Sequence, residues 1–454
     1  MKRLYDDDLY RFDTPQRSYW EATAGDLQVD AKSLAGSESC DVAIIGGGYT
    51  GLSAAYHLAR DYDVDVHVVE AGHIGWGASG RNGGFCCMGG TKVHGSDLIK
   101  KYGIEEARNW YRRQVESVEL VRQIGAEENL DFWPQGDSEY LVAHTPRDFE
   151  ELGRECDVLT EQLGIDANMI GREEFRERFY DSTEQYGAMR EGPAFGLHPL
   201  RYCLGLANAA VRNGAKLHDR SEVVEWTKGD DGQHCLVTNG GTLRAKRVIY
   251  ATNGFIREGL RPEYYAHTLP IISAIIATRP LSDEERAAHD WQTEQLMANT
   301  RRVLNYFRML PDGRFLFGGR GIGNGSASNE QETYANLKNM LATLWPHWSG
   351  VDVEYGWRGL ICFTGALRPA IGQLDDDPSV FHGFGYHGNG VAMATWSGSK
   401  LAEWIGTSKE PGLPAVVQGL GRKFPLPGLR LKYLQLGIAM SRWLDNRGRS
   451  ASAR

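Results

Sequence analysis

The chain lacks the sequence features of a secreted protein, of a protein stabilised by a structural metal ion, and of a membrane-spanning protein. Its seven cysteines include no C-x-x-C pair and no spacing typical of a metal site. No apolar run approaches the length of a membrane span, and the stretch MKRLYDDDLYRFD at the N-terminus has no apolar core of a signal peptide. These absences predict a protein of a reducing compartment, the cytoplasm, without a metal site and without membrane contact.

An excess of positive charge is missing as well. Lysine and arginine number 50 against 59 aspartates and glutamates, which gives a net charge of -9, so a nucleic-acid partner has no electrostatic basis. No Ser-His-Asp, zinc or paired-carboxylate arrangement stands at a diagnostic spacing. An acidic surface remains compatible with a cationic or zwitterionic small-molecule substrate.

What is present, near the N-terminus, is the pattern of a nucleotide-binding unit. Residues 41–70 predict a strand, a glycine turn, a helix and a second strand that ends in Glu70. The turn, residues 46–51, fits G-x-G-x-x-G, which allows a tight bend, close approach of a pyrophosphate and packing of the helix on the strand. An acid roughly 20 residues past the turn is placed to bind ribose hydroxyls. The motif predicts a bound dinucleotide and leaves NAD and FAD open.

Three further segments favour FAD. The loop GHIGWGASGRNGGF (72–85) offers Ser79 and Arg81 to phosphate, and backbone for close approach to a flavin ring. The stretch RVIYATNGF (247–255) reads as a strand that ends in a turn of small residues. In residues 379–407 a strand leads through a glycine turn into a helix, whose N-terminus would stabilise the negative charge of a reduced flavin.

The sequence gives less support to a flavin reductase or to a redox-active cysteine pair. There is a single dinucleotide fingerprint, which disfavours a flavin reductase fed by NADPH. The adjacent Cys86 and Cys87 are interpreted as packed thiols and not as a redox pair.

Together, these segments resemble the glycine/D-amino-acid oxidase superfamily of FAD enzymes, and within it the γ-glutamylputrescine oxidase-like branch. The most specific match is VVEAGHIGWGASGRNGG, and further matches are SYWEATA (18–24), NYFRMLPDGRFLFGGRG (305–321), WRGLICFTGALRPAIG (357–372) and GYHGNGVAMATWSGSKLAEWI (385–405). The resemblance implies an oxidase that removes a hydride from the carbon next to an amine nitrogen, leaves an imine for water to hydrolyse, and reduces O2 to H2O2. It departs from that branch at His387 and Asn389, where a small residue and a histidine are usual.

The motifs and the resemblance together predict a set of cofactor contacts. Some relatives bind FAD covalently through a cysteine near Cys362, but the local register differs here, so we expect non-covalent FAD. The predicted FAD-binding residues are Gly46, Gly48, Tyr49, Thr50, Gly51, Glu70, Ala71, Gly77, Ala78, Ser79, Arg81, Asn82, Gly83, Val224, Thr252, Arg368, Gly388, Asn389, Gly390 and Val391.

Three residues are candidates on the substrate side of the flavin. Arg368, in LRPAIG, falls where family members approach flavin and substrate. His387 could accept the amine proton or hydrogen-bond the ring, although a structural loop histidine is slightly favoured. Arg320 follows the apolar strand RFLFGG and could bind a substrate carboxylate, lie near the flavin nitrogen N5, or form a surface ion pair. The aromatic residues Trp76, Phe85, Tyr306, Phe363 and Tyr386 could wall a pocket for an alkyl amine.

The order of the motifs predicts an α/β fold of two discontinuous domains. A Rossmann-like FAD-binding domain would use residues 1–95, 190–260 and 355–454, and an α+β substrate domain with a mostly antiparallel sheet would use 96–189 and 261–354. Residues 429–444 read as an amphipathic helix that packs on its own domain.

Three alternative functions stay open at this point. The first is a dehydrogenase that passes electrons to a quinone or carrier, for which residues 429–444 would matter. The second is a flavin-binding structural protein without turnover, and the third is an NAD-dependent dehydrogenase without flavin.

Overall fold

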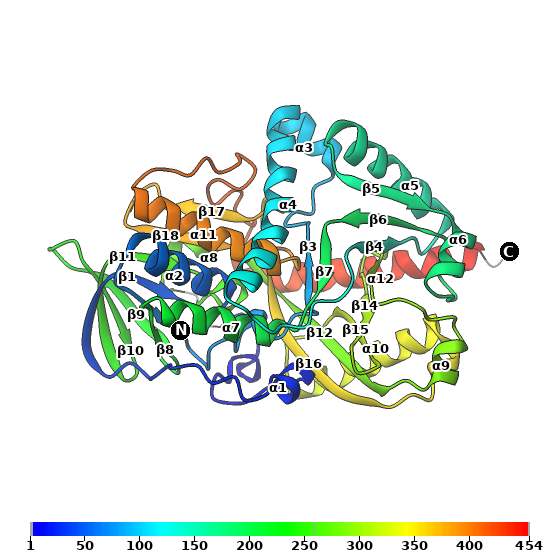
Figure 1. Ribbon diagram of the computed structural model, residues 1–454, viewed down its shortest axis with the longest axis horizontal. Coiled ribbons are helices and arrows are strands. Elements are labelled where there is room, and N and C mark those ends of the chain that lie inside the picture. Colours follow the sequence, from blue (N-terminus) through cyan, green and yellow to red (C-terminus); the bar gives the residue numbers. More distant parts are fainter. Residues whose placement is uncertain (1–2, 258, 453–454) are drawn as a thin grey trace.

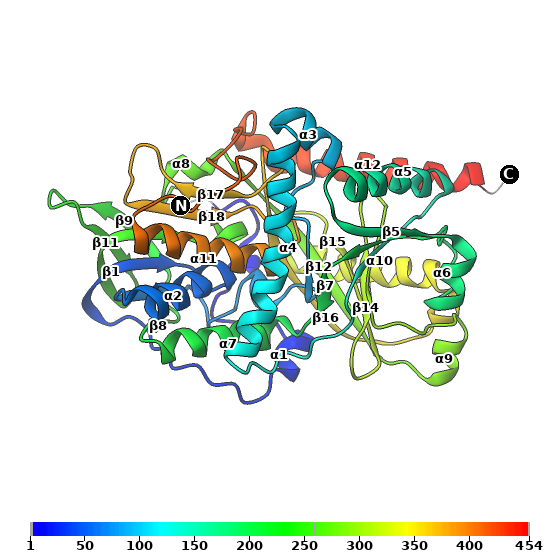
Figure 2. The same ribbon diagram turned by 45° about the horizontal axis from the view of Figure 1, so that its top comes forward.

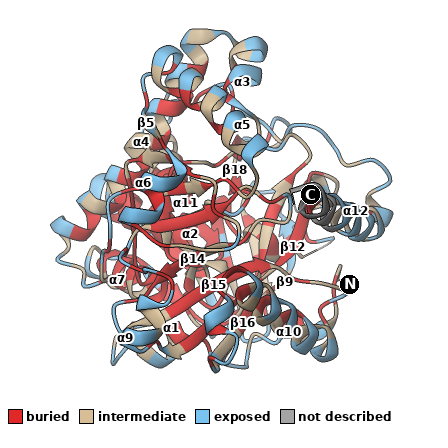
Figure 3. Cartoon of the chain, turned by 90° about the vertical axis from the view of Figure 1, so that its right-hand side faces the viewer, coloured by how far each residue is buried: buried red, intermediate tan, exposed pale blue. Residues whose placement is uncertain are grey.

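The computed structural model describes residues 3–257 and 259–452, which form two lobes side by side (Figure 1). One lobe is built on an eight-stranded sheet with helices packed on it, and the other on a second eight-stranded sheet. Helix α4 (Ile104–Glu127) runs between the lobes in both views (Figures 1 and 2). The strands are mostly buried, while the outer helices expose one side to solvent (Figure 3).

The first sheet has the parallel order expected of a dinucleotide-binding fold. Its strands run β17-β18-β11-β1-β2-β8, and every neighbouring pair is parallel except β17 with β18. Strands β9 and β10 extend β11 as antiparallel hairpins. The bounds are β1 (Gly36–Ile45), β2 (Val66–Val69), β8 (Lys216–His218), β9 (Val223–Lys228), β10 (His234–Thr238), β11 (Gly241–Tyr250), β17 (Ala370–Gln373) and β18 (Val380–Phe384).

Two helices cross closely on this sheet, and both start at the glycine turns found in the sequence. Helix α2 (Tyr49–Tyr62) follows the first turn, and α11 (Val391–Thr407) follows the last one. At their crossing, a Cβ added to Gly398 would lie 2.3 Å from the carbonyl oxygen of Thr50. Only a glycine allows this approach, which brings the N-termini of both helices to the same edge of the sheet. Helix α7 (Pro199–Arg212) packs beside α2.

The second sheet is antiparallel apart from one pair. Its order is β16-β12-β15-β14-β13-β4-β6-β5, and only β13 and β4 are parallel. An aromatic core that includes Tyr180, Trp291, Phe315 and Trp345 packs on it. The bounds are β4 (Glu139–Val142), β5 (Asp166–Ile170), β6 (Ala188–Gly192), β12 (Thr268–Pro280), β13 (Leu296–Asn299), β14 (Tyr306–Met309), β15 (Arg314–Arg320) and β16 (Val353–Thr364).

Smaller elements complete the described chain. Strands β3 (Phe85–Cys87) and β7 (Ala194–Gly196) form a two-stranded antiparallel sheet. The remaining α-helices are α1 (Tyr19–Thr23), α3 (Gly95–Tyr102), α5 (Pro146–Asp157), α6 (Arg172–Arg178), α8 (Pro262–Tyr265), α9 (Asp283–Ala287), α10 (Ala327–Leu344) and α12 (Arg430–Ser452). The predicted fold class, a Rossmann-like unit joined to an α+β unit with a mostly antiparallel sheet, is confirmed.

The division of the chain into two discontinuous domains stays a prediction, but the sheets show where each segment contributes. Strand β6 begins at residue 188 and belongs to the second sheet, as does β16, which ends at residue 364. Helix α12 also contacts the second lobe, because the Asp445 carboxylate accepts hydrogen bonds from the backbone N–H groups of Arg302 and Val303. Among the described residues, no helix has the length and apolar character to cross a membrane.

Candidate active site

A groove runs along the carboxyl edge of the first sheet and is shaped by glycines. Gly46 has a φ of +114°, and a Cβ there would lie 2.8 Å from the carbonyl oxygen of Ala251. A Cβ on Gly51 would lie 2.0 Å from the carbonyl oxygen of Gly46, so this glycine lets α2 pack against the turn. Gly51 therefore serves helix packing and lies outside the lining of the groove.

Glu70 closes one end of this groove. Its carboxylate accepts hydrogen bonds from the backbone N–H groups of Gly47, at 2.7 Å, and of Gly72, at 2.9 Å. Burial raises the pKa of the Glu70 carboxyl, against the lowering effect of these two donors. The acid is thus fixed against the glycine turn with one side open to the groove, as a ribose-binding carboxylate requires.

Two helix N-termini face the groove without a side-chain cap from their N-cap residues, Gly48 for α2 and Gly390 for α11. Uncapped N–H groups and the positive end of a helix dipole suit phosphate and a negatively charged ring. The Ser79 hydroxyl lies at the start of α2, where it accepts a hydrogen bond from Tyr49 N–H at 2.9 Å. The glycine cradle, the fixed acid and the two helix starts fit a dinucleotide that lies along the sheet.

Most of the predicted cofactor residues line this one groove. They come from three remote stretches of the chain, so the fold brings them together, although their contact with FAD stays a prediction. The lining residues among them are Gly46, Gly48, Tyr49, Thr50, Glu70, Ala71, Gly77, Ala78, Ser79, Asn82, Thr252, Gly388, Gly390 and Val391.

Six predicted cofactor residues lie outside the groove lining, among them Gly51, which packs the helix, and Arg368, described below. Val224 is not in the lining, because the strand presents Glu222 and Val223 to the groove instead. Arg81, Gly83 and Asn389 line a second cavity. The Arg81 guanidinium lies 3.7 Å from the ring centroid of Trp76 and donates to the carbonyl oxygen of Arg358, so it packs between the 72–85 loop and strand β16.

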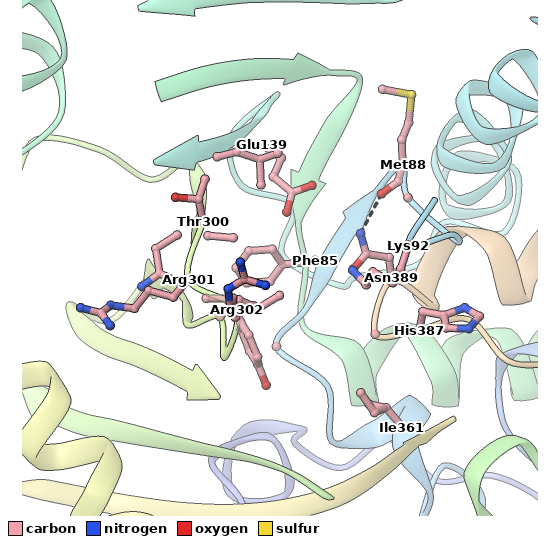
Figure 4. A pocket seen from close by; sticks show the side chains of 18 of the residues that line it. Phe85, Met88, Lys92, Glu139, Thr300, Arg301, Arg302, Ile361, His387 and Asn389 are labelled. Atoms are coloured by element: carbon pink, nitrogen blue, oxygen red, sulfur yellow. Dashed lines mark hydrogen bonds between the residues drawn. The ribbon is translucent and has the colours of Figure 1, made fainter. Parts of the chain in front are cut away.

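The second cavity, of about 930 Å³, lies between the groove and the second sheet. It opens onto the groove, because both hollows share the lining residues Ala78, Asn82, Ile361, His387, Gly388 and Val391. Figure 4 shows part of its wall, including Phe85, Glu139, Lys92 and Asn389, whose side-chain amide donates to the carbonyl oxygen of Met88. A ligand in the cavity would therefore meet the end of a dinucleotide that lies in the groove.

Among the described residues that line the cavity, four cationic side chains form no ion pair: Arg81, Lys92, Arg302 and Arg320. Arg320 and Lys92 are the two whose charges act on each other. Arg320 stands at the end of β15, with its guanidinium 5.6 Å from the ring centroid of Phe363. Burial lowers the pKa of Arg320, and burial together with the Arg320 charge lowers the pKa of Lys92. Within the part of the chain that the structure describes, neither side chain forms an ion pair. Arg320 is half-buried and Lys92 is exposed, but a ligand that fills the cavity would take both away from solvent. Burying an unpaired cation is costly, so the site is suited to an anionic group of a ligand.

Two acids lie side by side in the wall of the same cavity. Glu139 on β4 is the register partner of Glu191 on β6. Burial, and then the charges of Glu139 and Glu155, raise the pKa of Glu191 to about 8, and burial also raises the pKa of Glu139. Like charges directly opposite each other on neighbouring strands are destabilising, so the pair holds a proton near neutral pH and is suited to a cationic group.

We expect the free energy of unfolding to fall less steeply with rising pH in Glu191→Gln than in the wild type. The folded pKa of Glu191 is above its usual value, so the folded state keeps a proton that the unfolded state releases. Stability must therefore fall as the pH rises from about 4.3 towards about 8, by at most about 1.4 kcal/mol per pH unit. Melting temperatures between about pH 5 and pH 9 should decline less steeply in Glu191→Gln than in the wild type. Glu150→Gln, at an exposed position on α5, should behave as wild type, and equal slopes for all three proteins would refute the assignment.

His387 is held by backbone at both ring nitrogens. Its Nδ1 lies 3.1 Å from the carbonyl oxygen of Gly90, and its Nε2 accepts a hydrogen bond from Thr364 N–H at 3.1 Å. This arrangement places the proton on Nδ1, and burial lowers the pKa of the ring to about 3. Of the two roles considered for His387, the geometry supports the structural loop histidine and gives no free lone pair for an amine proton.

Arg368 was predicted at the flavin and substrate, but it lines neither the groove nor the cavity. The chain turns outward just before it, at Leu367, which has a φ of +56° and is 40% exposed. The guanidinium of Arg368 instead lies beside Gly421. The placement of Arg368 beside flavin and substrate came from the family resemblance alone, and the position of its side chain here does not support it.

The five aromatic residues predicted to wall a pocket do not all line the same hollow. Phe85 and Tyr306 line the cavity, Trp76 and Tyr386 line the groove, and Phe363 lines neither. Cys362 lines the groove, but burial raises the pKa of its thiol to about 12, which disfavours the thiolate that a covalent link would need. Cys86 and Cys87 are buried free thiols, as expected.

Lys92, Glu139 and Glu191 were missed by sequence reasoning. Lys92 stands in a glycine-rich stretch, GGTKVHG, directly after the FAD loop, and its closeness to that loop was a usable signal. Glu139 and Glu191 gave none, because their meeting depends on the pairing of β4 with β6.

Comparisons with known proteins agree with this site. A family model described as FAD dependent oxidoreductase, DAO, matches residues 41–404. The probable oxidoreductase OrdL of Rhizobium meliloti (strain 1021) is 31% identical over 96% of this chain and 98% of its own length. Gamma-glutamylputrescine oxidoreductase of Escherichia coli (strain K12) is 29% identical over 96% of this chain and 100% of its own.

Solved structures share the fold. Glycine oxidase from Geobacillus kaustophilus superimposes with a TM-score of 0.69 at 21% identity, and covers 86% of this chain and 100% of its own. L-amino acid deaminase from Proteus vulgaris gives a TM-score of 0.70 at 17% identity, with 89% and 99% covered. At these identities the likeness extends to the arrangement of the two lobes and no further.

Proposed function

Because this chain belongs to the DAO family of FAD dependent oxidoreductases, we propose that it oxidises the C–N bond of an amine that also carries a carboxylate. The candidate class is γ-glutamylated alkyl amines and related amino acids, since a relative that is 29% identical over nearly the whole chain is named gamma-glutamylputrescine oxidoreductase. A cytoplasmic location remains an expectation from the sequence alone.

The observation that carries the proposal is the pair of unpaired cations in the cavity that opens onto the groove. Arg320 and Lys92 both face this cavity, and both have their pKa lowered by burial. A substrate carboxylate would supply the missing counter-charge, and Arg320 offers it a bidentate geometry. Binding the carboxylate would orient the rest of the substrate towards the residues shared by cavity and groove.

The two neighbouring acids suit the other end of such a substrate. A γ-glutamyl group carries an α-ammonium as well as a carboxylate, and Glu139 with Glu191 could bind that ammonium while Arg320 and Lys92 bind the carboxylate. The amine to be oxidised must be neutral, and no acid is needed beside it. The cavity of about 930 Å³ is large enough for a flexible, drug-sized ligand.

FAD supplies the redox step, because when bound it accepts the hydride released from the carbon next to nitrogen, which leaves an imine for water to hydrolyse to a carbonyl compound and an amine or ammonia. The chain would hold this cofactor with its glycine turns, with the Glu70 carboxylate that Gly47 N–H fixes, and with the N-terminus of α11, which lies at the carboxyl edge of the first sheet. We infer that no covalent link forms, because the Cys362 thiol stays protonated.

We propose O2 as the electron acceptor, with H2O2 as the product. A second candidate, a dehydrogenase that reduces a quinone or carrier, is favoured by one observation. Helix α12 exposes the apolar side chains of Leu436 and Met440, at 71% and 62%, and its Leu444 lines the cavity. An apolar surface beside the substrate cavity could meet a membrane or a carrier protein.

The test is anaerobic reduction of the bound flavin by a panel of amines. We expect γ-glutamylputrescine and other carboxylated amines to bleach the oxidised flavin absorbance, and simple alkyl amines of the same length to bleach it far more slowly. Peroxide formed on re-aeration would support the oxidase, and slow reoxidation by air with fast reoxidation by a soluble quinone would support the dehydrogenase. A yellow protein that no amine bleaches would refute the proposed function.

A further inference from the structure

A cluster of three side chains lies on the first sheet, outside the lining of the groove. Glu38 near the start of β1, His67 on β2 and His218 at the end of β8 come from three strands that neighbour one another in the sheet. Among the described residues this is the one group of His, Cys, Asp and Glu whose possible ligand atoms all lie within 4.8 Å of one another. We propose that Glu38, His67 and His218 form a binding site for a divalent transition-metal ion, with Zn²⁺ as the ion that its ligands suit.

The spacing of the three ligand atoms fits a tetrahedral ion. His67 Nδ1 lies 3.1 Å from His218 Nε2 and 3.6 Å from Glu38 Oε2, and His218 Nε2 lies 3.9 Å from the same oxygen. Ligands bound at about 2.0 Å around a tetrahedral Zn²⁺ lie roughly 3.3 Å apart. Changes of a few tenths of an ångström would close the three atoms around one ion, with the fourth position left to water.

Both imidazoles can bind a metal ion, with the loss of one proton. A neutral imidazole binds a metal through the lone pair of its unprotonated nitrogen. The 3.1 Å hydrogen bond between His67 Nδ1 and His218 Nε2 places a proton on one of the two atoms, and metal binding would displace that proton. The Glu38 side chain is 35% exposed and can approach from the solvent side. Two imidazoles and one carboxylate with an open position form one of the common ligand sets of zinc.

A further carboxylate lies beside the His67 ring. Its other nitrogen, Nε2, is buried without a hydrogen-bond partner and lies 3.4 Å from Asp65 Oδ1. Metal binding through Nδ1 requires the proton on Nε2, and a carboxylate on that side favours this tautomer and strengthens the ligand. The nearby Lys216 charge lowers the pKa of His67 and would also repel a cation, so we expect binding weaker than at a four-ligand structural site.

The position implies a structural clamp. Glu38 and His67 lie near the starts of β1 and β2, and His218 is the last residue of β8. The backbone carbonyl oxygen of His218 also accepts a hydrogen bond from the N–H of Glu70, at 2.8 Å, and Glu70 lines the groove. A bound ion would hold β1, β2 and β8 together without contacting the substrate cavity. The sequence did not suggest this site, because His218 lies 151 residues after His67 and the three ligands meet only through the pairing of β1, β2 and β8.

The experiment measures metal binding directly and needs no turnover. Untagged holoprotein is stripped with a chelator and dialysed against Zn²⁺, and bound zinc and melting temperature are measured. We expect one zinc per chain and a higher melting temperature in the wild type, and loss of both effects in Glu38→Gln and His218→Gln. His347→Gln is the matched control, because it removes an exposed histidine from another histidine pair, His289 and His347, with ring centroids 5.2 Å apart.

Two results would overturn the inference. One is a wild-type protein that retains no zinc beyond the level of the double variant Glu38→Gln/His218→Gln. The other is zinc that binds equally to the wild type and to both single variants, which would place the ion elsewhere. Glu38→Gln keeps the experiment decisive if His218→Gln fails to fold, since the Glu38 side chain is partly exposed.

Discussion

Replacing Gly51 by valine should yield a protein that no longer holds FAD. A Cβ at this position would lie 2.0 Å from the carbonyl oxygen of Gly46 and 3.1 Å from the side chain of Ile44. Backbone cannot yield as a side chain can, so the start of α2 must move away from the glycine turn. We expect flavin content to fall at least about tenfold, which needs a loss of only about 1.4 kcal/mol in binding, and overpacking to destabilise the fold by about 1–3 kcal/mol or more.

The measurements are the flavin-to-protein absorbance ratio and the melting temperature, each with and without added FAD. Gly153→Val is the matched control, because a Cβ at Gly153 meets no atom within 4 Å. It should keep both its flavin and its melting temperature. Full flavin content in Gly51→Val would contradict the prediction, because the start of α2 would then have moved without loss of FAD binding.

Replacing Arg320 by methionine should separate substrate recognition from stability. Arg320 faces the cavity without an ion pair, so its removal deletes an uncompensated charge and should leave the melting temperature unchanged or higher. Loss of a buried, charge-assisted contact with a substrate carboxylate costs about 2–4 kcal/mol. We therefore expect kcat/KM for a carboxylated amine to fall roughly 30- to 1,000-fold.

Two controls make this result specific. The same variant should oxidise an amine that lacks the carboxylate as well as the wild type does. Arg314→Met changes an arginine of the same strand that is paired with Asp312 and Glu354, and it should keep its kcat/KM. If Arg320→Met loses activity equally with both substrates, the guanidinium acts on the flavin side and not on the carboxylate.

The nucleotide site was the part of the molecule that sequence could predict well. Its strand, glycine turn, helix and acid all lie within residues 41–70, so local periodicity and spacing were enough. The second glycine turn and α11 were predicted for the same reason, because the helix starts at Val391 directly after Gly390. Each of these features is specified by neighbours in the sequence.

The substrate cavity could be predicted only in part, because strand pairing assembles it. The two neighbouring acids belong to β4 and β6, which are about fifty residues apart and meet only in the folded sheet. The partners of His387, Gly90 and Thr364, also come from remote segments, so the sequence alone could not decide whether its ring was free. Arg368 was misplaced because a single left-handed residue, Leu367, redirects the chain.

The strand order of the first sheet has a consequence for synthesis on the ribosome. Strand β1, which ends at residue 45, lies between β2 and β11, and β11 begins only at residue 241. One edge of the nascent strand therefore stays unpaired while some two hundred further residues emerge, at about 5–20 residues per second. The groove also needs residues 388–391, so the cofactor can stabilise the chain only after these residues have emerged. Until then the exposed edge of β1 is a site for chaperone binding or for misassembly with other chains.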